Sequence, residues 1–212
     1  MSFLKNIFKK EQPQRTINKA KDLLVNDIIV LTDSFALPEH LRSQQFQVTE
    51  INSYEFENET QTEWVLTGSN NIELYLSLDV DDKTYLKFSI KIVHQDVESL
   101  FDLDEFATIF DEPGNAVLTR QDDSDHTTGW TSEAYQQRIY AQVGYFHRKD
   151  HRQDKLSEFE GKDSGEQFEL YQLLDQDEQY GVELEVWQDG DTDVFLTIYR
   201  PTTDIIDMYP GS

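Results

Sequence analysis

The stretch that decides the fold class is "TYLKFSIKI", residues 84–92, in which apolar and polar side chains alternate. The apolar members are Leu86, Phe88, Ile90 and Ile92, and the polar members between them are Lys87, Ser89 and Lys91. A period of two is typical of a β-strand with one buried face and one wet face. The stretch "NIELYLSL", residues 71–78, precedes it, and the turn at 79–83 predicts that the two form a β-hairpin.

Most of the chain on either side of this hairpin also has the sequence pattern of β-strands. Strand-like runs lie at 28–31, 46–56, 62–68, 168–174, 180–187 and 193–200, and Asp189-Gly190 predicts a tight turn between the last two. The run "RIYAQVGYF", residues 138–146, fits either a strand or a helix, and its aromatic and β-branched content favours a strand. The tail, residues 201–212, is expected to form extended coil or an edge strand.

Two segments have helical spacing instead. Residues 16–26 place apolar side chains on one helical face behind Thr16, a possible N-cap, and predict a short N-terminal helix. Residues 97–110 have a second apolar stripe, in which Asp102 and Glu105 have the spacing of a capping box. Pro113-Gly114 is expected to end this second helix.

The two ends of the chain resemble each other in the order of their segments. An "EFE" at 55–57 is followed by strand-like segments at 64–66 and 72–74, and an "EFE" at 158–160 is followed by similar segments at 168–170 and 182–184. Duplication explains this likeness, and so does chance similarity between acidic meanders. The first explanation predicts two related β units, each built from a similar succession of strands.

We therefore predict a mainly β, or β-rich α+β, fold in which an antiparallel meander forms two similar small sandwich-like or barrel-like units. A short N-terminal helix and one helix near 97–110 complete it. The predicted parts are a basic N-terminal segment and linker at 1–15, a first β unit at 16–95, a connecting segment with a helix and a strand at 96–150, and a second β unit at 151–212.

Three stretches resemble an uncharacterised bacterial family, the domain of unknown function 4178 type. They are "DLLVNDIIVLTD", "EWVLTG" with the hairpin after it, and "YAQVGYFHRKDH", and the resemblance covers roughly residues 23–172. The chain departs from the pattern at Asn26, where the family has Gly. The resemblance implies a small β-rich cytoplasmic domain of no established activity, with some relatives encoded near membrane-stress and polyamine-ligase-like proteins.

Charge is distributed unevenly along the 212 residues, which carry 42 acidic and 18 basic side chains and a net charge of −24. Residues 1–22 hold six basic and two acidic residues, so the rest of the chain carries −28. An acidic body repels nucleic-acid phosphates, and nucleic-acid binding is therefore not expected. No long apolar run or secretory signal occurs, which predicts a cytoplasmic protein, and peripheral contact with the inner face of the membrane is compatible with this location.

The motifs that carry enzymatic chemistry are missing from the sequence. The chain has no cysteine, no phosphate-cradling glycine loop and no nucleophile elbow, so we expect a non-catalytic protein without a cofactor. His147 and His151 have the spacing of metal ligands on a helix, but neighbouring cations favour a solvated basic loop. The acidic loops at 122–129 and 189–195 lack the glycine and glutamate of an EF-hand, and no metal site is predicted.

The remaining candidate contact residues lie in the opening decapeptide, "MSFLKNIFKK". Its apolar and basic side chains have the spacing of an interfacial helix and predict contact with a protein partner or a membrane surface. The predicted contact residues are Phe3, Leu4, Lys5, Ile7, Phe8, Lys9 and Lys10. Trp130, in the polar stretch "HTTGWTSE", is expected to be partly exposed and able to face a ligand.

Three functional hypotheses follow from these features. The first is a non-catalytic binding or adaptor protein that uses the N-terminal segment. The second is a cation-binding or polyamine-binding accessory protein that uses its acidic surface. The third is a nucleic-acid mimic.

Overall fold

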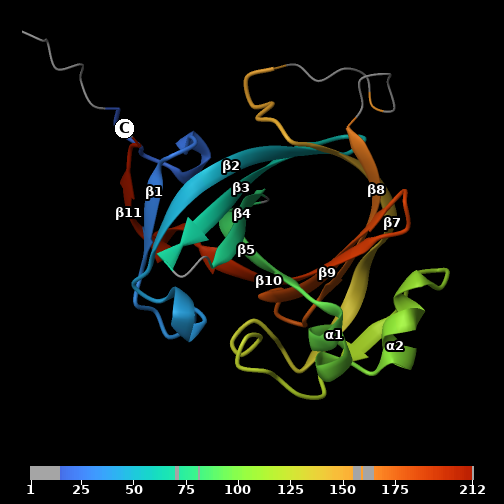
Figure 1. The fold of residues 1–212 in the computed structure, drawn as a ribbon. Helices are drawn as coiled ribbons and strands as arrows, with labels where there is room; N and C mark the ends of the chain where they lie inside the picture. The colour runs from blue at the N-terminus through green and yellow to red at the C-terminus, as the bar shows by residue number, and fades with distance from the viewer. Residues whose placement is uncertain (1–14, 70–71, 81, 155–158, 160–164, 212) are drawn as a thin grey trace, which may run out of the picture.

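The computed structural model describes residues 15–69, 72–80, 82–154, 159 and 165–211, and its main feature is a strongly curved antiparallel sheet (Figure 1). In this described part the strand order is β11-β1-β2-β3-β4-β5-β10-β9-β8-β7-β6. The strands are β1 (Ile28–Leu31), β2 (Gln45–Glu55), β3 (Thr60–Gly68), β4 (Glu73–Val80), β5 (Thr84–Ile92), β6 (Val117–Thr119), β7 (Ala134–His147), β8 (Glu166–Leu174), β9 (Tyr180–Trp187), β10 (Thr192–Pro201) and β11 (Ile205–Tyr209). The predicted β-rich class is confirmed.

A second pairing of β2 closes the sheet into a ring. Ser53, Tyr54 and Glu55 pair with His147, Phe146 and Tyr145 of β7. The closed ring is therefore β2-β3-β4-β5-β10-β9-β8-β7, and Figure 1 shows it surrounding a central opening. Strands β1 and β11 lie outside the ring, as do the helices α1 (His94–Leu100) and α2 (Leu103–Ala107).

The ring is assembled from two meanders of four strands each. The first is β2 to β5 and the second is β7 to β10, and they meet at the pairs β5–β10 and β2–β7. The two meanders share one barrel instead of closing into two separate units. The second meander begins with β7, inside the segment at 96–150 that was expected to connect the units. The origin of the halves by duplication stays a prediction.

The hydrophobic core lies on the outer face of the ring. Trp64, Leu76, Phe88, Leu184 and Leu196 each have an exposed fraction of 1% or less. They belong to one cluster with Leu37, Leu41, Phe101 and Trp130, which come from the segments around the ring. These segments include the 3-10 turn η2 (Glu39–Leu41) and the chain between α1 and β7. The apolar face of "TYLKFSIKI" is therefore buried as predicted, but outside the barrel.

Both predicted helices are shorter than expected because tertiary contacts interrupt them. The N-terminal helix is only a 3-10 turn, η1 (Ala20–Asp22), after which Leu23 is extended and accepts a hydrogen bond from the Trp64 indole N–H at 3.2 Å. The second helix is broken at Phe101, which is extended and bridges to Arg120. Asp102 does cap α2, since its carboxylate accepts from the N–H groups of Asp104 and Glu105.

Candidate ligand-binding site inside the barrel

The polar face of the deciding stretch lines the interior of the barrel. Lys87 and Ser89 border the narrow centre, and Lys91 borders the larger cavity at one end. This face was expected to be wet, and it is instead largely enclosed: Ser89 is 7% exposed and donates to or accepts from Thr197 at 2.9 Å. Alternation separates a polar face from an apolar one, but it does not say whether the polar face meets bulk water or a cavity.

Three carboxylates project into this interior from two strands. Glu63 comes from β3, and Glu183 and Glu185 come from β9, with exposed fractions of 8%, 6% and 8%. Residues two apart on a strand share a face, so Glu183 and Glu185 both point inward. A buried carboxylate is costly unless it is paired, hydrogen-bonded or protonated. The three glutamates differ in which of these three forms of compensation they have.

Both carboxylate oxygens of Glu183 have a polar partner. Its Oε2 lies 2.6 Å from the Lys87 ammonium nitrogen, and its Oε1 accepts a hydrogen bond from the Gln172 amide at 2.8 Å. The same Gln172 amide also donates to the Tyr199 hydroxyl at 3.3 Å. Lys87 thus neutralises Glu183, and it forms no ion pair with the other two carboxylates.

Glu63 and Glu185 form the unneutralised part of the cluster. Glu63 accepts hydrogen bonds from the Asn52 amide at 3.1 Å and from the Tyr54 hydroxyl at 3.3 Å. Among the described residues, no lysine, arginine or histidine forms an ion pair with either carboxylate, and the cation that acts on both is Lys87, already paired with Glu183. The Tyr54 hydroxyl, which donates to Glu63, also lowers the pKa of Glu185 and therefore lies near both carboxylates.

Burial dominates the electrostatics of this pair. It raises the pKa of Glu63 to about 7, against the hydrogen bonds from Asn52 and Tyr54. Burial, followed by the charge of Glu63, raises the pKa of Glu185 to about 8. The pKa of Tyr54 is also raised, by burial and by the nearby glutamates. Near neutral pH the pair therefore retains protons that exposed glutamates would have lost.

A cavity of about 720 Å³ opens above this pair at one end of the barrel. Its rim carries a further set of acids: Glu50, Glu73, Glu166, Asp189, Asp191 and Asp193. Two cations accompany them, and both face acids: Lys91 lies 2.6 Å from Asp193, and Arg148 lies 4.0 Å from Glu166. The rim of the cavity is therefore strongly negative.

Aromatic rings form two walls of the same cavity. On one side, Phe146 contacts Trp187 with ring centroids 5.8 Å apart and Tyr54 with centroids 5.0 Å apart. On another, Tyr75 and Phe195 meet edge to face at 5.5 Å. Aromatic faces carry negative charge density and attract cations in addition to providing apolar contact.

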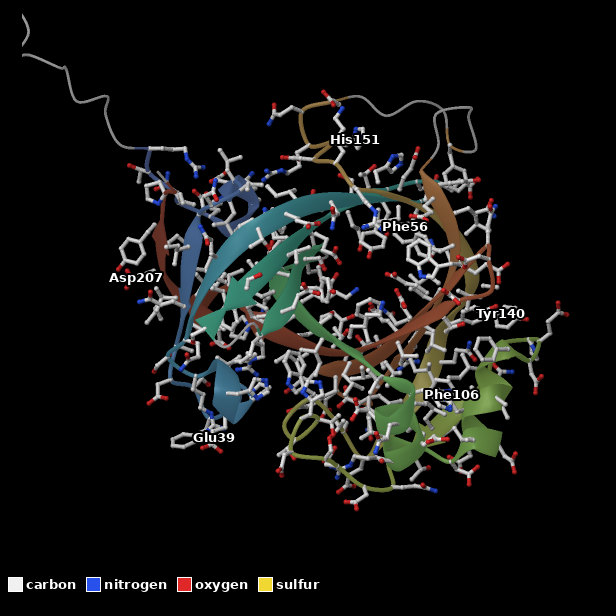
Figure 2. The ribbon with its side chains drawn as sticks, in the orientation of Figure 1. Glu39, Phe56, Phe106, Tyr140, His151 and Asp207 are labelled. Carbon is white, nitrogen blue, oxygen red and sulfur yellow. The ribbon has the colours of Figure 1, made fainter. Side chains whose placement is uncertain are left out.

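Below the pair, the barrel narrows and opens again. The centre holds about 40 Å³, bordered by Lys87, Ser89 and Glu183, and a second cavity of about 590 Å³ lies at the opposite end. Phe56 takes part in the narrowing, since its ring packs edge to face on Phe168 at 5.9 Å, and Figure 2 shows it on the inner side of the ring. The first cavity therefore has a floor, and that floor carries Glu63 and Glu185.

The residues singled out from the sequence lie elsewhere. Trp130 was expected to be partly exposed, which is wrong: it is 0% exposed, belongs to the outer core and donates its indole N–H to His40 Nε2 at 3.3 Å. The polar neighbours that suggested exposure form turns around it. Phe3, Leu4, Lys5, Ile7, Phe8, Lys9 and Lys10 lie outside the described residues.

His147 and His151 also differ from the expected solvated loop. His147 ends β7 and its Nε2 lies 3.0 Å from Glu55 Oε2, while the ring of His151 packs against it with centroids 4.9 Å apart. Figure 2 shows His151 on the outer side of the ring of strands. Within the described ranges, no group of three histidine, aspartate or glutamate side chains is arranged to hold a metal ion.

The sequence contains one signal for this candidate site. In "YGVELEVW" two glutamates alternate with Val182, Leu184 and Val186 in the middle of a strand, away from any turn. Carboxylates in such a position either face solvent or line an enclosed polar space. Only the closure of the ring decides between these alternatives.

Comparisons with known proteins do not add to this picture. No family model matches the chain, and neither the curated proteins nor the solved structures gave a match. The resemblance to the domain of unknown function 4178 type therefore stays a prediction. None of the helices in the described part of the chain has the length and apolarity needed to cross a membrane.

Proposed function

We propose that the protein binds a small organic cation in the acidic cavity of its barrel. The observation that carries this proposal is the position of Glu63 and Glu185 on the cavity floor, nine-tenths buried and without an ion-pair partner among the described residues. A bound cation supplies to Glu63 and Glu185 the counter-charge that Lys87 gives to Glu183. The interior of an eight-stranded barrel is also of a size that holds one small ligand.

The walls favour an organic cation over a bare metal ion. Tyr75, Phe146, Trp187 and Phe195 give the cavity apolar area, which a hydrated ion does not use. The acidic rim adds a long-range attraction for positive ligands and repels anions. The proposal thus places the cation-binding hypothesis inside the barrel instead of on the outer acidic surface.

The test is a calorimetric titration with four ligands that share one chain and differ in charge: hexylamine, hexyltrimethylammonium, hexanol and hexanoate. At least one cation is expected to bind with 1:1 stoichiometry, at least about tenfold tighter than hexanol, because a charge in a low-dielectric site gains more than a kcal/mol from an opposite charge. Binding should persist at moderate salt, since buried charges are screened less than exposed ones.

The matched variants separate the cavity from the general acidity of the protein. Changing both floor residues, Glu63→Gln and Glu185→Gln, should abolish the preference for cations. Glu98→Gln removes one negative charge from α1, outside the ring, and should leave binding unchanged. Equal binding of all four ligands, or equal effects of the two sets of variants, would contradict the proposal.

The other functional hypotheses stay predictions. Contact with a partner or membrane through residues 1–10 is tested by comparing the recovery of the full chain and a chain lacking them on vesicles and in partner capture. Mimicry of a nucleic acid is tested by competition with DNA for a basic protein. The absence of catalysis likewise stays a prediction.

A further inference from the structure

The cavity floor has features that specify the head group of the ligand, and this inference rests on the proposed function. We propose that Glu63, Glu185 and Tyr54 form a seat for a protonated primary or secondary amine, and that the arriving ammonium displaces a proton held by the two glutamates. Without a ligand, the two glutamates would hold a proton between them. With a ligand bound, the N–H-bearing cation would take the place of that proton.

The geometry of the seat comes from strands on opposite sides of the barrel. Glu63 lies on β3 and Glu185 on β9, and the Tyr54 hydroxyl of β2 lies near both. Both carboxylates border the large cavity and the narrow centre, so they stand at the boundary between the two. The oxygens of the two glutamates are hydrogen-bond acceptors that an ammonium group satisfies with its N–H donors.

The charged and titratable groups that act on the pair come from β2, β4, β5 and β9. They are Tyr54 from β2, Glu73 and Tyr75 from β4, Lys87 from β5 and Glu183 from β9. Lys87 is the cation of this set, and its ammonium is held by Glu183. The negative charges of Glu73 and Glu183 oppose full ionisation of the pair, whereas the Tyr54 hydroxyl favours the ionised form.

Two neighbouring carboxylates in a buried site do not both ionise without a counter-charge. The raised pKa values of Glu63 and Glu185 agree with this arrangement, since the pair keeps a proton near neutral pH. When an ammonium enters, it provides the counter-charge, and the proton passes to bulk water. Charge balances, because one proton leaves for each positive head group that binds.

The same geometry discriminates between kinds of cation. A quaternary ammonium has no N–H group and cannot donate to Glu63 or Glu185, although its methyl groups can contact the aromatic walls. It would leave two buried acceptors without donors, which is costly. Selectivity for N–H-bearing heads is therefore a direct consequence of a carboxylate floor.

The experiment compares hexylamine with hexyltrimethylammonium at pH 7.5 in two buffers that contain no primary or secondary amine and differ in their enthalpies of ionisation, phosphate and HEPES. For hexylamine, the two observed heats should differ by the amount that corresponds to release of up to one proton. Its affinity should rise from pH 6 to pH 8 by up to about tenfold per pH unit, because the seat loses its competing proton over this range. Hexyltrimethylammonium should bind at least about tenfold more weakly, given the cost of unmet acceptors.

Variants distinguish the seat from the rest of the cavity. Glu185→Gln removes one of the two groups that hold the displaceable proton and should reduce both the buffer dependence and the pH dependence, while Glu98→Gln should leave both unchanged. Tyr54→Phe keeps the two carboxylates and should retain proton release. Circular dichroism confirms that each variant is folded before it is titrated.

Each outcome of the experiment decides between the two proposals. Binding of hexylamine with equal heats in both buffers, or binding of the quaternary ligand as tightly as the amine, overturns this inference and leaves the proposed function standing. If neither cation binds more tightly than hexanol, the proposed function fails as well. Proton release with N–H selectivity supports both.

Discussion

Lys87 and Glu183 form an ion pair of 2.6 Å inside the barrel, joining β5 to β9 across the intervening β10. The Lys87 and Glu183 side chains are 17% and 8% exposed. The pair divides the interior carboxylates into a neutralised one and two that face the open cavity. The stability of the barrel and the chemistry of its cavity are therefore linked through a single lysine.

Substitution Lys87→Met should destabilise the protein by about 3–5 kcal/mol near pH 8, because removing one partner leaves a buried charge uncompensated. Urea unfolding measures this loss. The control is Lys91→Met, whose side chain is 47% exposed and whose ion pair with Asp193 should contribute less than about 1 kcal/mol. Equal losses in the two variants would show that the Lys87 pair is not a buried one.

The floor glutamates should make stability fall as the pH rises. Their pKa values in the folded protein are about 7 and about 8, above the ordinary value of 4.5, so the folded state binds more protons than the unfolded state between these limits. The contribution of these groups is thus present at low pH and is lost as the pH rises toward 8. Glu185→Gln should flatten this dependence.

At pH 8.5 the Glu185→Gln variant should be more stable than the native chain by an amount on the order of a few kcal/mol, since one pKa unit corresponds to 1.36 kcal/mol. Thermal unfolding from pH 5 to pH 9 gives the comparison. Glu98→Gln is the control, because this exposed side chain on α1 should leave the curve unchanged. Parallel curves for the native chain and Glu185→Gln would contradict the assignment.

Gly144 of β7 allows the aromatic narrowing of the barrel to form. A Cβ at this position would lie 2.5 Å from Phe168 Cζ and 2.8 Å from Phe56 Cε1. Gly144→Ala should therefore cost about 1–3 kcal/mol through overpacking. Gly181→Ala should cost less, because its nearest contact is at 3.1 Å to a flexible leucine terminus. Chemical denaturation of the two variants tests the order, and the reverse order would contradict it.

Asp27 ties the beginning of the described chain to its end. Its carboxylate contacts Arg15 and accepts from the backbone N–H groups of Leu24 at 2.6 Å and Gly211 at 2.9 Å. Burial opposes ionisation of Asp27, but these partners outweigh it and lower its pKa. The stabilisation is present above the ordinary value of 3.8 and is lost as the pH falls below it.

Asp27→Asn should cost about 1–3 kcal/mol at pH 7, because the amide cannot serve all of these donors. The cost should shrink as the pH falls from 3.8 toward the lowered pKa of the native carboxyl, because the native chain loses the same stabilisation there. Asp22→Asn is the control, since Arg15 uses only the backbone carbonyl of Asp22. Urea unfolding at pH 7 and pH 3 tests both expectations, and a loss of equal size at the two pH values would contradict them.

The strands could be predicted from the sequence because alternation and turn residues are local signals. The hairpin of β4 and β5, the strand over 138–146 and the turn at Asp189-Gly190 are all confirmed. Gly190 has a φ of 94°, as a glycine-dependent turn requires. Residues 205–209 form the predicted edge strand against β1. These features depend on neighbours in sequence.

The site could not be predicted, because it depends on pairings between distant residues. Glu63 and Glu185 become neighbours only when β2 pairs with β7 and β5 pairs with β10. Trp130 was misplaced for the same reason: its burial is provided by residues such as His40, 90 positions away. The helix at 97–110 was broken by the pairing of Phe101 with Arg120, which no local signal indicates.

The short pairing of β2 with β7 is the contact that closes the barrel. It consists of three residue pairs, Ser53 with His147, Tyr54 with Phe146 and Glu55 with Tyr145, so it can form only after both meanders have been brought together. None of these six residues belongs to the core cluster among the described residues. The contact that closes the ring and the contacts that bury the core are therefore made by different residues of β2 and β7.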